Sequence, residues 1–152
     1  MTNAINTTLY FDMDGTIADL YGVTNWLEFL INEETTPYDN AKGIINLSHF
    51  ARLINTLKRK GYKLGIISWT SKNGSCEYNK AVADSKKKWL AKHLASVEFD
   101  EIHVIPYGVP KKTVATTDNA ILFDDEQRNL DEWGGRAVNA NSMIEYLKGL
   151  CA

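Results

Sequence analysis

Two pairs of aspartates follow apolar runs in this sequence, and such pairs could do nucleophilic, acid–base or metal-binding chemistry. The stretch "YFDMDGT" places Asp12 and Asp14 after the first run, and "ILFDD" places Asp124 and Asp125 after a later one. Carboxylates that share a cleft raise one another's pKa and cost stability unless a cation compensates them. Oxygen ligands without a nearby His or Cys suit a hard ion such as Mg²⁺.

Each pair also has a plainer interpretation. Asp12 and Asp14 alone are equally well explained as a strand end that turns at Gly15. Asp124 and Asp125 precede a predicted helix, where an aspartate is favoured as an N-cap. The motifs must therefore be weighed together with the elements that carry them.

Short apolar runs separated by amphipathic segments predict a parallel sheet covered by helices on both faces. We expect strands at Thr7–Met13 and at residues 62–68, 101–107, 120–123 and 135–140. We expect helices at residues 46–61, 81–94, 126–133 and 141–150. The predicted fold class is α/β, a Rossmann-like three-layer α/β/α arrangement with a mostly parallel five-stranded sheet. In such sheets ligands bind beyond the carboxyl ends of the strands, which is where both aspartate pairs lie.

Two further motifs follow strands or precede them. Ser68 ends the strand "LGIIS", and "PKK" places Lys111 and Lys112 before the "ILFDD" strand. Taken singly, Ser68 is better explained as a residue that begins a turn, and the lysines as surface charge. The triple lysine of residues 86–88 is expected to lie largely on the solvated face of its helix.

The order of these motifs resembles the haloacid dehalogenase-like phosphatase superfamily. The resemblance rests on "DMDGT", "LGIIS", "PKK" and "ILFDD", and it extends from Phe11 to Asp125. It implies a phosphatase that forms an aspartyl-phosphate and uses Mg²⁺. A receiver-type phosphoacceptor domain is a poorer match, because its acidic pair lies on the first strand and its lysine follows the last.

The resemblance also implies roles for individual residues. Asp12 would be the nucleophile, Asp14 the general acid and base, and Ser68 a donor to a phosphoryl oxygen. Gly15, Thr16, Trp69 and Thr70 are expected around the phosphate, with Thr70 a competitor for the role of Ser68. The lysine that stabilises the phosphoryl charge would be Lys111 or Lys112, with a slight preference for Lys111 and with Lys88 as a third candidate. The predicted metal ligands are Asp12, Asp14 through its backbone carbonyl, Asp124 and Asp125, of which Asp125 is the preferred direct ligand from the second pair.

A narrower resemblance concerns the substrate. The stretches "FDMDGTIAD", "KKKWLAKHL" and "ILFDDEQRNL" are similar to the 5'(3')-deoxyribonucleotidase-like branch, which implies a nucleotide monophosphate. The interval that remains for a cap insert, about residues 20–43, is much shorter than in that branch. A phosphatase of nucleic-acid ends, a phosphotransferase or mutase, and a non-catalytic Mg²⁺- and phosphate-binding module are the alternatives. Aromatic residues near this interval could cover a ring-shaped substrate or could belong to the core.

Composition limits the class of protein. The chain has 152 residues, a formal net charge of −2 and 44% hydrophobic residues, as expected for one domain over residues 1–152. No apolar run approaches the ~20 residues that span a bilayer, and no signal peptide is predicted. The two cysteines have no metal-binding spacing, which favours a cytoplasmic protein with reduced thiols. We expect a small phosphorylated substrate and no membrane partner, leave nucleic acid open as a partner, and consider a homo-oligomer in which a second subunit covers the site.

Overall fold

The computed structural model describes residues 4, 6–117 and 119–152, and it contains a five-stranded parallel sheet. The strand order is β5-β4-β1-β6-β7. The strands are β1 (Thr7–Phe11), β4 (Lys63–Trp69), β5 (Glu101–Ile105), β6 (Asn119–Asp124) and β7 (Arg136–Asn139). The predicted α/β class and all five predicted strands are confirmed, and every pair in this sheet is parallel.

Strand β1 lies at the centre of the sheet because both of its faces carry apolar side chains. Leu9 and Phe11 point into the larger core cluster, whereas Tyr10 belongs to a smaller cluster on the opposite face. All five residues of β1 are buried. Its neighbours are β4 and β6, so the ends of these three strands lie next to one another.

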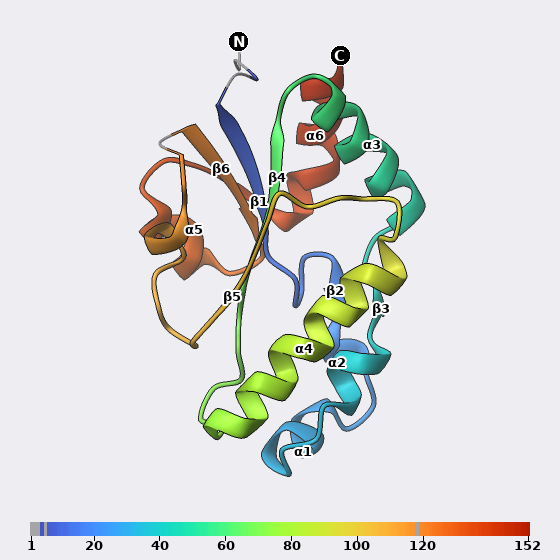
Figure 1. The fold of residues 1–152 in the computed structure, drawn as a ribbon, viewed down its shortest axis with the longest axis vertical. Coiled ribbons are helices and arrows are strands. Elements are labelled where there is room, and N and C mark those ends of the chain that lie inside the picture. The colour runs from blue at the N-terminus through green and yellow to red at the C-terminus, as the bar shows by residue number, and fades with distance from the viewer. Residues whose placement is uncertain (1–3, 5, 118) are drawn as a thin grey trace.

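Helices cover both faces of the sheet (Figure 1). Side chains of α3 (Leu47–Arg59), α4 (Cys76–His93) and α6 (Met143–Cys151) pack on the face of Leu9 and Phe11. Trp133 of α5 (Gln127–Trp133) packs against Tyr10 on the other face. The described residues also form three short 3₁₀ turns, η1 (Leu20–Gly22), η2 (Lys111–Val114) and η3 (Ala140–Ser142). The three-layer arrangement is that of a Rossmann-like fold.

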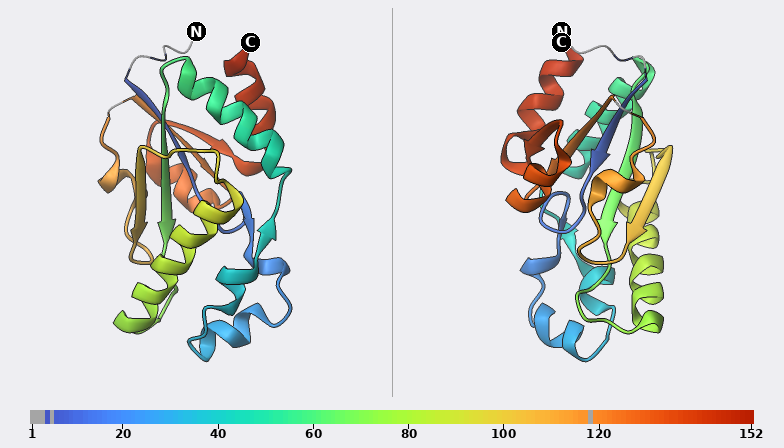
Figure 2. Two further views of the ribbon diagram at one scale, coloured as in Figure 1. Left: turned by 45° about the vertical axis from the view of Figure 1, so that its right-hand side comes forward. Right: turned by 90° about the vertical axis from the view of Figure 1, so that its left-hand side faces the viewer.

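Helix α4 begins five residues before its predicted start. The side chain of Ser75 accepts a hydrogen bond from the backbone N–H of Tyr78 at 3.1 Å, which caps the helix at the end of the polar loop. The helix therefore has 18 residues, and its first turns extend beyond the carboxyl ends of the strands (Figure 2).

The segment between β1 and α3 forms a small helical unit beyond the carboxyl ends of the strands (Figures 1 and 2). We call residues 18–43 the insert. Its elements are β2 (Ala18–Asp19), η1, α1 (Trp26–Ile31), α2 (Thr36–Asn40) and β3 (Lys42–Gly43). Strands β2 and β3 pair antiparallel, so the chain leaves and re-enters the body side by side. The turn-rich stretch of residues 33–43 thus holds one short helix, which has a proline in its first turn.

The insert is tied to α4 by polar contacts. The Glu33 carboxylate accepts hydrogen bonds from the backbone N–H and the hydroxyl of Ser75, both at 2.8 Å. The hydroxyl of Tyr78 donates to the carbonyl of Glu34 at 2.9 Å. About two helical turns after Tyr78 in α4, the hydroxyl of Ser85 donates to Asp39. These contacts fix the position of the insert relative to α4.

Candidate active site

The chain turns sharply after β1, and the side chains of Asp12 and Asp14 on this turn contact different lysines, Lys111 and Lys86. The backbone N–H groups of Ile17 and Ala18 both donate to the carbonyl of Met13, at 3.0 and 2.9 Å. Gly15 has a φ of +85°, a conformation that other residues adopt only with strain. A Cβ atom there would lie 2.3 Å from Oδ2 of Asp125. Glycine at this position therefore lets the second aspartate pair pack directly against the turn.

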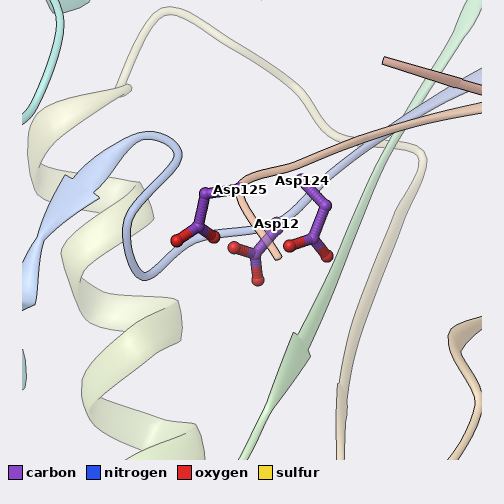
Figure 3. A group of neighbouring side chains, drawn as sticks. All are labelled: Asp12, Asp124 and Asp125. Atoms are coloured by element: carbon purple, nitrogen blue, oxygen red, sulfur yellow. The ribbon is translucent and has the colours of Figure 1, made fainter. Parts of the chain in front are cut away.

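Three of the four predicted aspartates form one acidic cluster. Carboxylate oxygens of Asp12, Asp124 and Asp125 lie within 4.8 Å of one another, and Figure 3 shows Asp12 between the other two. The backbone pairing explains this, since the N–H of Asp12 donates to the carbonyl of Phe123 at 3.0 Å. Thr16, which is buried, donates its hydroxyl to Asp12 at 3.0 Å and reaches Asp125 at 3.4 Å.

Lys111 lies against this cluster. Its Nζ atom is 2.8 Å from Oδ1 of Asp12 and 2.7 Å from Oδ2 of Asp124, and the residue is 4% exposed. Burial alone would lower the pKa of Lys111, but the charges of Asp12 and Asp124 outweigh that effect and raise it. Lys111 is therefore charged at neutral pH.

The neighbouring Lys112 is placed elsewhere. Its Nζ atom lies 4.7 Å from the ring centre of Trp133, and the side chain is exposed. Of the two adjacent lysines, the structure brings only Lys111 to the carboxylates.

Lys86 corrects the expectation for the triple lysine. It is 1% exposed, whereas Lys87 and Lys88 are exposed. Its Nζ atom donates to Oδ2 of Asp14 at 2.9 Å, to the hydroxyl of Ser68 at 2.7 Å and to the carbonyl of Trp69 at 2.6 Å. Lys88, the third candidate for the catalytic lysine, does not reach the acidic cluster.

The helical spacing of apolar residues in the sequence indicates that Lys86 is buried, although the three consecutive lysines suggest an exposed surface. Val82, Trp89 and Leu90 form the buried stripe of α4. Position 86 is four residues after Val82 and three before Trp89, which is the spacing of that same stripe. Asn129 is a second residue that the motif reasoning missed, and its amide nitrogen donates to Oδ2 of Asp124 at 3.1 Å.

The phosphate-site residues at the end of β4 are brought to the same place. Ser68 is buried, and Trp69 and Thr70 line the cavity described below. The backbone N–H groups of Thr70 and Ser71 are already donated, to the carbonyl of Ile105 and the side chain of Asn79. We therefore expect hydroxyl groups at this strand end, and not those two amides, to face a ligand.

The carboxylates are mutually destabilising in the absence of a cation. Burial, followed by the charge of Asp12, raises the pKa of Asp125 to about 8. Burial also raises the pKa of Asp14, although the charge of Lys86 opposes the effect. The site contains four carboxylates and two buried ammonium groups, which leave a formal charge of −2. One divalent cation would balance that charge.

The residues present fit such an ion. Mg²⁺ prefers oxygen ligands and keeps several waters. The cluster offers three carboxylates whose oxygens lie within 4.8 Å of one another. Oδ1 of the buried Asn129 side chain has no hydrogen-bond partner among the described residues, and it adjoins Asp124. An acceptor in that place suits a water bound to the metal. The carboxylate of Asp14 is directed to Lys86 and is not part of the cluster, and the ligand expected from this residue is its backbone carbonyl.

A cavity of about 810 Å³ opens from the acidic cluster toward the insert. Asp12, Asp14 and Lys111 lie at its inner end. Its walls are rich in aromatic side chains, with Tyr21, Trp26 and Tyr38 from the insert and Trp69 and Tyr107 from the body. Tyr21 and Trp26 contact each other edge to face with ring centres 4.9 Å apart. The cavity thus has a charged end and an aromatic, half-open end.

A solved structure with a similar fold is the D,D-heptose 1,7-bisphosphate phosphatase from Burkholderia thailandensis. The two chains align with a TM-score of 0.54 and 14% sequence identity, over 84% of this chain and 72% of that one. This likeness is one of fold, and it does not single out the deoxyribonucleotidase-like branch.

The sequence comparisons add nothing to this likeness. Searches with protein-family models and against curated proteins find no match for this sequence. Among the described residues, none of the helices is both long and apolar enough to cross a membrane.

Proposed function

We propose that this protein is a Mg²⁺-dependent phosphomonoesterase that uses Asp12 as its nucleophile. The observation that carries the proposal is the pairing of Asp12 with Lys111 at 2.8 Å inside a cluster of three carboxylates. A carboxylate attacks a phosphoryl group readily only where cations neutralise the phosphoryl oxygens. Here a fixed ammonium and a cluster suited to a divalent cation flank the same carboxylate.

Asp12, Asp124 and Asp125 are the residues that would hold the ion. When bound, Mg²⁺ would neutralise phosphoryl charge and fix the orientation of the phosphate. Lys111 donates two of its three N–H groups to Asp12 and Asp124, which leaves one N–H group for a phosphoryl oxygen. Ser68 accepts a hydrogen bond from Lys86, so its own hydroxyl proton is available to a second phosphoryl oxygen.

Asp14 is proposed as the general acid and base. In the first step an oxygen of Asp12 bonds to phosphorus, the bond to the leaving oxygen breaks, and Asp14 gives its proton to that oxygen. In the second step water attacks the aspartyl-phosphate and passes its proton to Asp14, and the bond between Asp12 and phosphorus breaks. Burial already raises the pKa of Asp14, which favours the protonated form that the first step needs.

The substrate is proposed to be small and to carry a ring, with nucleotide monophosphates as the first choice. The aromatic walls of the cavity and its volume of about 810 Å³ support this choice, since aromatic faces stack on bases. In this proposal the insert acts as a minimal cap. The fold shared with a sugar bisphosphate phosphatase makes sugar phosphates the natural comparison.

The decisive experiment is a phosphate-release screen with nucleotide, sugar and aryl phosphates, each with Mg²⁺ and with EDTA. We expect release that requires Mg²⁺ and that falls about 10³-fold or more in Asp12→Asn. Borohydride reduction during turnover would convert an aspartyl-phosphate at position 12 into homoserine, which mass spectrometry detects.

Two results would contradict the proposal. Undiminished release by Asp12→Asn would rule out Asp12 as the nucleophile. No release from any substrate, combined with Mg²⁺ binding, would favour the non-catalytic binding module. A preference for 5'- or 3'-phosphorylated oligonucleotides over mononucleotides would transfer the proposal to nucleic-acid ends.

A further inference from the structure

The two buried lysines of the site differ in the donors that they have left. An ammonium group has three N–H donors. Lys86 uses all three, on Asp14, Ser68 and the carbonyl of Trp69. Lys86 therefore has no N–H donor left for a phosphoryl oxygen, whereas Lys111 keeps one.

The groups that Lys86 does contact are both assigned to the reaction. It binds Oδ2 of Asp14, which leaves Oδ1 as the oxygen that can exchange a proton with a leaving group. The same Nζ atom holds the Ser68 hydroxyl at 2.7 Å. One ammonium thus fixes the distance between the acid–base group and a donor to the phosphate.

Lys86 is itself positioned by the insert. The ring of Tyr38, from α2, lies 5.2 Å from the Lys86 Nζ atom and is 5% exposed. Asp39 of the same helix binds Ser85, the residue next to Lys86. Tyr38 and Asp39 therefore place one side of α2 against the segment of α4 that carries Lys86.

We propose that Lys86 is a positioning residue that holds Asp14 for protonation of the leaving group, and that α4 links its position to the docking of the insert. The inference rests on the proposed phosphatase function and assigns no contact with substrate to Lys86. Its main effect is on the step in which the bond to the leaving oxygen breaks and Asp14 supplies the proton, and its contact with Ser68 adds a smaller effect that every substrate shares. Attack by Asp12 and neutralisation by Lys111 do not depend on it.

This division of roles predicts a dependence on the leaving group. An alkyl alkoxide needs a proton as it leaves, whereas p-nitrophenolate is stable without one at neutral pH. Lys86→Met should lower kcat/KM about 10²-fold on an alkyl phosphate and less than about 10-fold on p-nitrophenyl phosphate, because kcat/KM reports the steps up to formation of the aspartyl-phosphate and not its hydrolysis, in which Asp14 also acts. Asp14→Asn should show the same bias in kcat/KM, and the double variant should be less than about 10-fold slower than Asp14→Asn. Lys111→Met should slow both substrates equally, and Lys87→Met, on the exposed face of α4, should slow neither.

Lys86→Gln keeps a hydrogen-bonding side chain and provides the same ratio of rates if Lys86→Met does not fold. Equal losses on both substrates, or a change confined to KM, would overturn the positioning role and leave the phosphatase proposal intact. No turnover of either substrate by the wild-type protein would overturn both. A leaving-group bias in Lys86→Met but not in Asp14→Asn would show that Lys86 acts through a group other than Asp14.

Discussion

The two halves of the site are built by different means. On one side Lys111 comes from a short turn that precedes β6, and it meets Asp12 and Asp124 at the ends of adjacent strands. On the other side Lys86 comes from the middle of a long helix and meets Asp14 and Ser68. The first lysine retains a donor and faces the cavity, whereas the second is saturated and faces protein.

This difference shows that burial of a lysine does not by itself indicate that the lysine binds the substrate. Both lysines are almost fully buried and both contact aspartates. The number of donors already used, and the residues that use them, distinguish a group that can bind a phosphoryl oxygen from one that can only hold another side chain. Variants on the two sides can therefore test the comparison separately.

The largest expected effect is on turnover when Lys111 is removed. Lys111→Met should lower kcat by about 10²–10³-fold on every substrate, because a fixed positive charge beside the phosphoryl group is lost. Lys112→Met is the matched control, since its side chain lies over Trp133 and away from the carboxylates. Steady-state kinetics with two unrelated phosphates would measure this. A loss in Lys112→Met that equals the loss in Lys111→Met would break the comparison.

The next effect is on stability when Lys86 is removed. Lys86→Met leaves Asp14 and Ser68 without their shared partner, and breaking a buried ion pair costs about 3–5 kcal/mol. The Asp14 side chain is 19% exposed, so we expect a cost just below that range, about 2–3 kcal/mol. Urea unfolding in EDTA would measure the change. Lys88→Met, on the exposed side of the same helix, should stay within about 0.5 kcal/mol of the wild type.

A comparable effect concerns the metal. Free Mg²⁺ at 100 times its Kd should stabilise the protein by about 2.7 kcal/mol, detected as a rise in Tm that EDTA reverses. Asp125→Asn should abolish this rise. The same variant should not lower the Tm of the metal-free protein, because burial and the charges of Asp12 and Asp124 disfavour the charged form of Asp125, as its raised pKa indicates. A normal Mg²⁺ response in Asp125→Asn would place the ion elsewhere.

The smallest effect concerns the contact between Glu33 and α4. Hydrogen bonds from the N–H and the hydroxyl of Ser75 lower the pKa of Glu33. A carboxylate whose folded pKa is lowered contributes stability above its unfolded pKa, and that contribution is lost as the pH falls through the folded value. Glu33→Gln should therefore lower the Tm slightly at pH 7, and this difference should shrink as the pH falls below 4.5. A difference between the two proteins that is independent of pH would contradict this contact as the cause.

The strands and their acidic ends were predictable because their signals are local. Short apolar runs bounded by turn residues identified all five strands of the sheet, and parallel pairing then brought Asp12 beside Asp124 and Asp125. These features depend on neighbours in sequence or on a single pairing rule.

The position of Lys86 depended on partners far away in the chain. Three consecutive lysines span about 200° around a helix, and position 86 is the one that falls on the stripe of Val82, Trp89 and Leu90. Whether its charge is tolerated there depends on Asp14 and Ser68, which lie 72 and 18 residues away in sequence. The same holds for the early start of α4, which depends on the Ser75 cap and on Glu33.

The central place of β1 has a consequence for how the molecule opens. Residues 7–11 are hydrogen-bonded to strands on both sides, and their amides should be among the last to exchange with deuterium. The insert is joined to the body by a two-residue ribbon and a few side chains, and its amides should exchange much earlier. On heating, the cover of the cavity should therefore be released while the nucleophile is still in place. In the proposed mechanism a protein in that state would keep Asp12 and Lys111 in place, but it would lose the selectivity of the insert and the contacts that position Lys86.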